Sequence, residues 1–91
     1  MKYASYPEPG WRPRVGQWVR YSGPNSGLHG GVGQVLGVKS TGFTHVSMRG
    51  SKTGNVFQYG CSPIYLHPVG PAAKAIEIAC RALKIKGEPV A

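Results

Sequence analysis

Short runs of β-branched and aromatic residues, separated by clusters of glycine, proline and small polar residues, occupy the middle of the chain. Over 44–49, apolar Val46 and Met48 alternate with polar His45 and Ser47, which is typical of a strand with one buried face. The same reasoning predicts five strands, at 15–21, 30–38, 44–49, 56–59 and 64–66. We therefore expect one domain that consists mainly of β-strands.

The period of the apolar positions changes after residue 70. Pro71 suits the first turn of a helix, and good helix formers follow without an interior glycine or proline, which predicts a helix over 71–86. Its charged residues share one stripe, and its apolar residues form a wide face that we expect to cover the strands. Small residues on this face allow close helix approach, so a homo-oligomer formed through the helix is the alternative. These residues are Ala72, Ala75, Ala79 and Ala82.

Residues 1–14 contain three prolines, with basic and aromatic residues between them. Proline interrupts both helices and sheet ladders, so we expect an extended arm with no core to join. The chain is thus predicted to consist of an arm (1–14), a β-domain (15–69) and a C-terminal helix with a tail (70–91).

The composition narrows the class of protein. The chain has 91 residues with 11 Lys and Arg against three Asp and Glu, and its formal net charge is +8. Such a charge favours an acidic partner, either nucleic acid or an acidic protein. The chain has no aspartate and only three scattered glutamates, which argues against catalysis by a pair of carboxylates. Its 14 glycines and eight prolines suit a small β-barrel with many turns.

Cysteine and histidine are too few and too scattered for a zinc site. Cys61 and Cys80 lie 19 residues apart, and two cysteines fit a reducing compartment better than a disulfide-rich secreted scaffold. No stretch approaches the ~20 apolar residues of a membrane span, and none resembles a leader. We expect a cytoplasmic, non-enzymatic protein with no catalytic residue, metal, cofactor or membrane contact.

The order of strands and turns resembles an SH3-like small barrel, because a long glycine-rich loop follows the first strand and a proline corner precedes the fifth. The segments 15–20 (VGQWVR) and 30–35 (GGVGQV) resemble the KOW-type nucleic-acid and ribosome-associated modules. Together with Tyr59-Gly60 ahead of 64–66 (IYL), they are also similar to the mind-bomb type of SH3-like repeat, a peptide-binding module. The resemblance covers residues 15–69 and implies a five-stranded SH3-like barrel, flanked by the arm and the helix.

The pattern is also similar to the type II dihydrofolate reductases, SH3-like barrels that form tetramers around a pore lined by a Val-Gln-Ile-Tyr segment. This chain offers 62–65 (SPIY) and 56–59 (VFQY) instead. The first has no glutamine, and the second shifts it by one position, which turns it to the opposite face of a strand. Because of these two differences, a tetrameric reductase ranks third among the functions considered, after nucleic-acid binding and protein binding.

Basic and aromatic residues are the candidate binding residues, because Lys and Arg neutralise phosphates and exposed rings stack on unpaired bases for about 1–3 kcal/mol each. The leading hypothesis is binding of RNA or single strands, and the alternative is a phage or bacterial adaptor or inhibitor that binds an acidic protein.

Leu28 in the glycine-rich loop 22–31 is expected to be exposed and to mark a protein contact. For Trp18 and Tyr59 we favour a place in the core. The candidate site residues are Trp11, Arg12, Arg14, Arg20, Leu28, His29, Lys39, Arg49, Lys52 and Tyr59.

Overall fold

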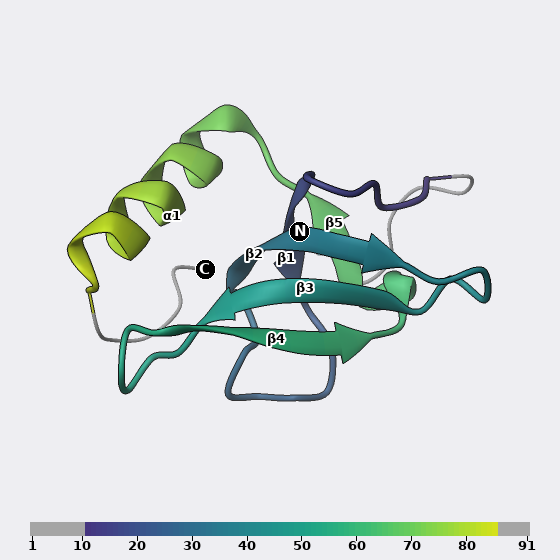
Figure 1. Ribbon diagram of the computed structural model, residues 1–91, viewed down its shortest axis with the longest axis horizontal. Coiled ribbons are helices and arrows are strands. Elements are labelled where there is room, and N and C mark those ends of the chain that lie inside the picture. Colours follow the sequence, from purple (N-terminus) through teal and green to yellow (C-terminus); the bar gives the residue numbers. More distant parts are fainter. Residues whose placement is uncertain (1–10, 86–91) are drawn as a thin grey trace, which may run out of the picture.

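The computed structural model describes residues 11–85, which form one five-stranded antiparallel sheet and a C-terminal helix (Figure 1). The elements are β1 (Trp18–Tyr21), β2 (Val32–Val38), β3 (Thr44–Arg49), β4 (Val56–Cys61), the 3-10 helix η1 (Pro63–Tyr65), β5 (Leu66–Pro68) and α1 (Pro71–Leu83). The strand order is β4-β3-β2-β1-β5, so β4 and β5 are its edges and the sheet is not closed within the described residues. The expectation of a mainly β fold with five strands and a C-terminal helix is confirmed.

The observed bounds differ from the predicted ones where turn chemistry intervenes. The strand predicted at 44–49 is confirmed as β3, but the fifth strand begins two residues later than predicted. Pro63 opens η1 there, and the Ser62 side chain accepts a hydrogen bond from the Ile64 backbone N–H at 3.4 Å. A proline in the first helical position and a serine cap favour such a turn over a strand.

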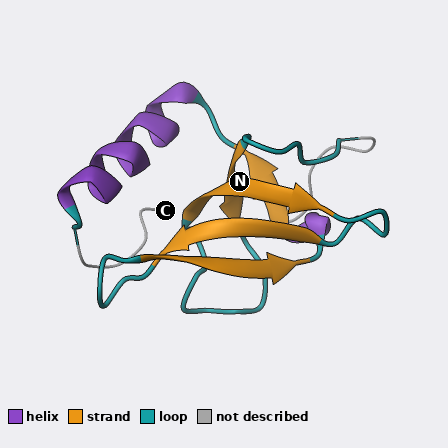
Figure 2. Ribbon diagram, viewed as in Figure 1, coloured by secondary structure: helices purple, strands orange, loops and turns teal. Residues whose placement is uncertain are grey.

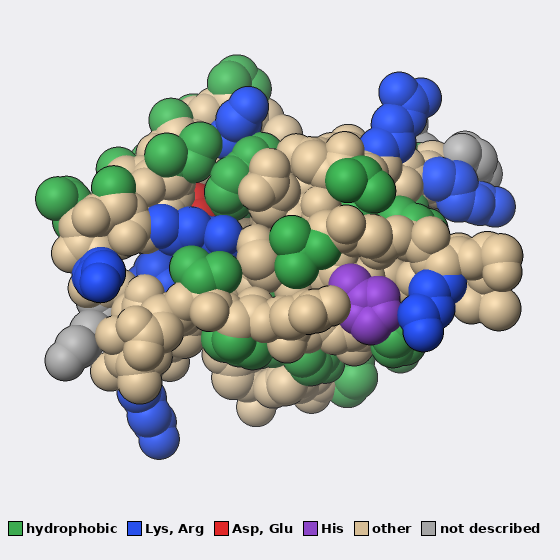
Figure 3. Space-filling view, in the orientation of Figure 1, with side chains coloured by type: hydrophobic (Ala, Val, Ile, Leu, Met, Phe, Trp, Pro, Cys, Tyr) green, Lys and Arg blue, Asp and Glu red, His purple; other side chains and the backbone are tan. Residues whose placement is uncertain are grey.

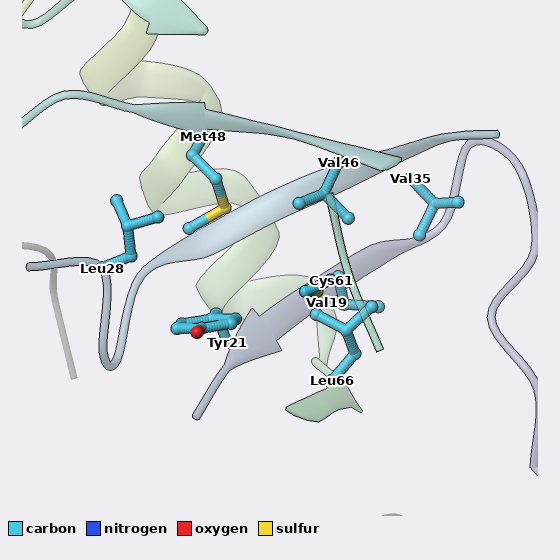
Figure 4. Packing of buried hydrophobic residues seen from close by; sticks show 8 residues of the cluster. All are labelled: Val19, Tyr21, Leu28, Val35, Val46, Met48, Cys61 and Leu66. Atoms are coloured by element: carbon cyan, nitrogen blue, oxygen red, sulfur yellow. The ribbon is translucent and has the colours of Figure 1, made fainter. Parts of the chain in front are cut away.

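The core lies between two groups of strands, β1 with β5 and β2 with β3 and β4. In Figures 1 and 2 the strands of the first group cross those of the second steeply. In the register of the sheet, Val46 of β3 pairs with Val35 of β2 and with Tyr59 of β4, which continues one apolar row across three strands. Figure 4 shows the buried cluster, which consists of Val19, Tyr21, Leu28, Val35, Val46, Met48, Cys61 and Leu66.

Leu28 belongs to this core and is only 8% exposed. The prediction of an exposed loop tip is therefore wrong. The loop 22–31 folds back on β1, because the Gly30 N–H donates to the Tyr21 carbonyl at 2.8 Å and the Tyr21 N–H donates to the Gly31 carbonyl at 2.9 Å. This compact turn directs the Leu28 side chain inward beside Met48 and Tyr21 (Figure 4).

The helix α1 contacts the outer face of the sheet with its polar stripe. Glu77 is 4% exposed, whereas Ile76 and Leu83 are 51% and 72% exposed. The expectation that the wide apolar face covers the strands is therefore wrong. The reason lies in β3, which presents Arg49 to the helix: a buried guanidinium needs a partner of opposite charge, and Glu77 supplies it.

The helix ends at Leu83, three residues before its predicted end, because Lys84 adopts a left-handed conformation with φ 53°. The Lys84 and Ile85 N–H groups bond to the last carbonyls of the helix at 3.2 and 3.0 Å. This turn brings the Ile85 carbonyl within 2.8 Å of Arg49 Nη1, so the end of α1 is attached to β3. Within residues 11–85, no helix is long and apolar enough to cross a bilayer.

Candidate nucleic-acid interface

The candidate residues from the sequence do not form one continuous site. Trp11, Arg12, Arg14 and Lys39 lie toward one end of the molecule, Leu28, Lys52 and Tyr59 line a groove elsewhere, and Arg49 is enclosed between β3 and α1. Each place has a different composition, so each suits a different partner.

The last residues of the predicted arm pack against the domain. Trp11 is half-buried against the core cluster, which corrects the expectation that this part of the arm has no core to join. The segment is attached to β2, because the Gly16 N–H donates to the Val35 carbonyl and the Val35 N–H to the Gln17 carbonyl, both at 2.8 Å. The arm residues 1–10 lie outside the described part of the chain.

Trp11, Arg12, Arg14 and Gln17 line a pocket of about 390 Å³. Both arginines are exposed, and Arg12 Nη1 donates to the Trp11 carbonyl at 2.9 Å. Gln17 Oε1 accepts from the Arg14 backbone N–H at 3.1 Å, which fixes the chain at the base of the pocket. An indole beside two exposed guanidinium groups provides a stacking surface and two phosphate ligands in one place.

The turn between β2 and β3 adds a third cation and two aromatic rings at this end of the molecule. Lys39 is exposed, and its N–H donates to the Phe43 carbonyl at 2.9 Å, which closes the turn. The Phe43 ring is 42% exposed and meets the His45 ring edge-on, with centroids 5.4 Å apart. Figure 1 shows the turn at the same end as the segment that begins at residue 11, and Figure 3 shows several blue Lys and Arg side chains at that end, one of them beside a purple histidine.

We call this end of the molecule the basic–aromatic end and define it by the pocket residues Trp11, Arg12 and Arg14 and the turn and strand residues Lys39, Phe43 and His45. Sequence reasoning missed Phe43 and His45. A signal was present for both residues, since Phe43 follows a predicted turn and His45 lies on the polar face of a predicted strand. Their ring contact depends on the bend between turn and strand, which the pattern does not specify.

The charges exposed over residues 11–85 all have one sign. Glu77 is the one carboxylate among these residues, and it is 4% exposed. The exposed cations are Arg12, Arg14, Lys39, Lys52, Lys74 and Lys84. A phosphate chain that approaches the described residues therefore meets no exposed carboxylate. This favours binding of a polyanion anywhere on the described surface.

Arg49, which the sequence predicted as a binding residue, is buried and is not part of this surface. Its side chain is 4% exposed and donates to both carboxylate oxygens of Glu77, at 3.1 and 3.4 Å. Arg20 has a structural contact, since its Nη1 donates to the Gly30 carbonyl at 2.8 Å and holds the glycine-rich loop. His29 is exposed on that loop and is not one of the six residues of the basic–aromatic end.

A second pocket, of about 370 Å³, lies between the loop 22–31 and the β3–β4 hairpin. Most of its lining surface is apolar, with Leu28, Phe57 and Tyr59 among the lining residues, and Lys52 is its one cation. Phe57 is 41% exposed and was missed by sequence reasoning, whereas Tyr59 packs against the core as expected. This apolar groove suits a peptide side chain better than a phosphate.

Burial makes one of the two cysteines a poor nucleophile. Both thiols are free, and burial raises the pKa of Cys61 to about 11, which disfavours the reactive thiolate. Among residues 11–85, no three His, Cys, Asp or Glu side chains are grouped so that they would hold a metal ion.

Comparisons of the chain with protein-family models, with curated proteins and with solved structures found no match.

Proposed function

We propose that this chain is a non-enzymatic module that binds single-stranded nucleic acid, RNA in the first place, at the basic–aromatic end. The observation that carries the proposal is the pocket formed by Trp11, Arg12 and Arg14. Bases stack on the indole, guanidinium groups bind the flanking phosphates, and Lys39 extends the positive surface.

The position of α1 favours a single strand over a duplex. A helix that reads the major groove has to present polar or charged side chains to the base edges. The charged Glu77 and Arg81 of α1 are instead bound to the sheet, and Ile76 and Leu83 are exposed. The helix is therefore unsuited to reading a duplex. The rings of Trp11 and Phe43 can instead stack on unpaired bases.

The proposed fold class is the SH3-like small barrel of the KOW type. The order β4-β3-β2-β1-β5, with the 3-10 helix η1 before β5, supports this assignment, although β4 and β5 are not paired in the described sheet. The assignment predicts that the loops between strands form the binding surface, as the β2–β3 turn does in the basic–aromatic end. The free thiols of Cys61 and Cys80 support a place in a reducing cytoplasm.

The test is fluorescence anisotropy with labelled single-stranded RNA, single-stranded DNA and duplex DNA at about 0.05 and 0.15 M salt. We expect Arg12→Gln/Arg14→Gln to weaken binding to RNA at least about tenfold and to reduce the salt slope by about two. The matched control is Lys74→Gln/Lys84→Gln, which removes the same charge from α1 and the residue that follows it. Equal losses in both variants, or no binding at about 0.15 M salt, would contradict the proposal.

Binding of an acidic protein through the groove is the second candidate, and the exposed Phe57 ring beside Lys52 favours it. A partner in this groove would be lost with Phe57→Ser and retained with Arg12→Gln/Arg14→Gln. The two candidates therefore respond oppositely to the same pair of variants.

A further inference from the structure

The helix α1 turns its apolar face away from the sheet. Four residues at successive turns of this face are exposed, and they are Ala72, Ile76, Ala79 and Leu83. Ile76 is 51% and Leu83 72% exposed, and Figure 3 shows green side chains along the outer side of the helix. A continuous apolar surface of this kind, on a helix held from behind by polar contacts, marks an interaction site.

We propose that the occupant of this face is α1 of a second copy of the chain, packed antiparallel about a two-fold axis between Ile76 and Ala79. Ala72, Ile76, Ala79 and Leu83 are four, three and four residues apart, which keeps their side chains on one stripe of the helix. The two-fold axis places Ala72 opposite Leu83 of the second copy and Ile76 opposite Ala79 of the second copy. Every layer then combines one large and one small side chain.

This alternation makes the face complementary to itself, as a two-fold interface requires. A parallel pair would place Leu83 on Leu83 and Ala72 on Ala72, which crowds one layer and leaves a void in another. Ala72 and Ala79 allow the helix axes to approach closely. In the antiparallel pair the two helix dipoles point in opposite directions, which is electrostatically favourable.

The charges of the helix agree with this arrangement. Glu77 and Arg81 face the sheet, and Lys74 and Lys84 lie outside the stripe, so the interface contains no charged side chain. The net charge of +8 still makes two copies repel each other at longer range. Salt screens this repulsion, so association is expected to strengthen with salt, whereas nucleic-acid binding weakens.

The interface is small. A helix of 13 residues is about 20 Å long, so one helix pair buries less than the ~800 Å² per partner of a standard interface. We therefore expect a dimer with a Kd of about 10–100 μM.

The test is analytical ultracentrifugation of the full chain with reducing agent and without nucleic acid, from about 10 to 500 μM at 0.05 and 0.5 M salt. We expect the mass to rise from 9.7 kDa toward twice that value, with tighter association at high salt. Ile76→Lys is expected to weaken association at least about tenfold. The matched control is Ile64→Lys, which changes a similarly exposed isoleucine in η1 and leaves association unchanged.

Two further variants test the register. Ala79→Ile alone places two isoleucines opposite each other and weakens association, whereas Ile76→Ala/Ala79→Ile restores one large and one small residue per layer and retains it. Thermal melting confirms that each variant is folded.

A monomer at about 500 μM in both salts would overturn the proposal, and so would equal effects of Ile76→Lys and Ile64→Lys. A monomer that binds anionic vesicles and loses that binding with Ile76→Lys would replace the second copy by a lipid surface. The result for RNA binding does not depend on these outcomes, because the two surfaces share no residue.

Discussion

Arg49 of β3 and Glu77 of α1 form an ion pair inside the protein, with Arg49 Nε 3.1 Å from Glu77 Oε2 and with side chains only 4% and 6% exposed. Arg81 contacts the same carboxylate oxygen at 2.9 Å, and its guanidinium lies 4.9 Å from the centre of the Trp18 ring. Arg81 also donates to the hydroxyl and the carbonyl of Ser47. This cluster, rather than apolar packing, attaches the helix to the sheet.

Glu77→Gln is expected to destabilise the protein by about 3 kcal/mol, because it leaves two largely buried guanidinium groups without a counter-ion. Urea denaturation followed by circular dichroism measures the loss. Lys74→Gln, on the exposed side of the same helix, is the control and should stay within about 0.5 kcal/mol of the wild type. A loss below about 1 kcal/mol for Glu77→Gln would show that the cluster contributes little to stability.

The β-strands could be predicted from the sequence because their signals are local. The alternation over 44–49 specifies β3, and the prolines and glycines between the apolar runs specify turns. The packing of α1 could not be predicted in this way. Glu77 and Arg81 have the spacing of an exposed helix pair, and nothing near them in the sequence shows that Arg49 lies on the opposing strand.

The candidate site was predictable only in part, for a related reason. The run from Trp11 to Arg14 combines an aromatic ring with cations, and that composition is visible without a structure. Whether a given cation is exposed depends on tertiary contacts, which place Arg12 on the surface and Arg49 inside. The same limit applies to Trp18, which was expected in the core and lies half-buried beneath Arg81.

Leu28→Ala is expected to destabilise the protein by about 2–3 kcal/mol, since it removes a buried side chain from the edge of the core. Chemical denaturation measures this loss, and Leu83→Ala serves as the control because Leu83 is 72% exposed. Affinity for single-stranded RNA should not change in either variant. Full stability of Leu28→Ala, combined with loss of a protein partner, would instead support an exposed Leu28.

The two cysteines are expected to differ in reactivity at pH 8. Cys61 is buried and its pKa is raised to about 11, whereas Cys80 is half-buried, so iodoacetamide should alkylate Cys80 first. Mass spectrometry of tryptic peptides, with and without urea, measures both rates. Faster alkylation of Cys61 than of Cys80 in the native protein would contradict the buried position.

The raised pKa of Cys61 also predicts loss of stability in alkali. The thiol titrates near 9.0 when exposed and near 11 in the folded protein, so the unfolded state releases its proton first. The stabilising difference is complete below pH 9 and is lost as the pH rises to 11. Urea midpoints at pH 8 and pH 10.5 should therefore differ, and Cys61→Ala should reduce the difference without abolishing it, because the pKa of Tyr21 is also raised, to about 12.

Lys84→Gly is expected to stabilise the protein by about 0.5–1 kcal/mol. Lys84 has φ 53° and ψ 47° at the end of α1, where a residue with a Cβ is strained and glycine is not. Its side chain is exposed, so the substitution removes little packing, although the greater freedom of glycine in the unfolded chain offsets part of the gain. Gly54→Ala, the comparison variant, is expected to destabilise, because Gly54 has φ 76° and a Cβ there would lie 2.9 Å from the Lys84 carbonyl oxygen. Thermal denaturation measures both changes, and a lower melting temperature for Lys84→Gly would show that the lysine side chain stabilises the turn.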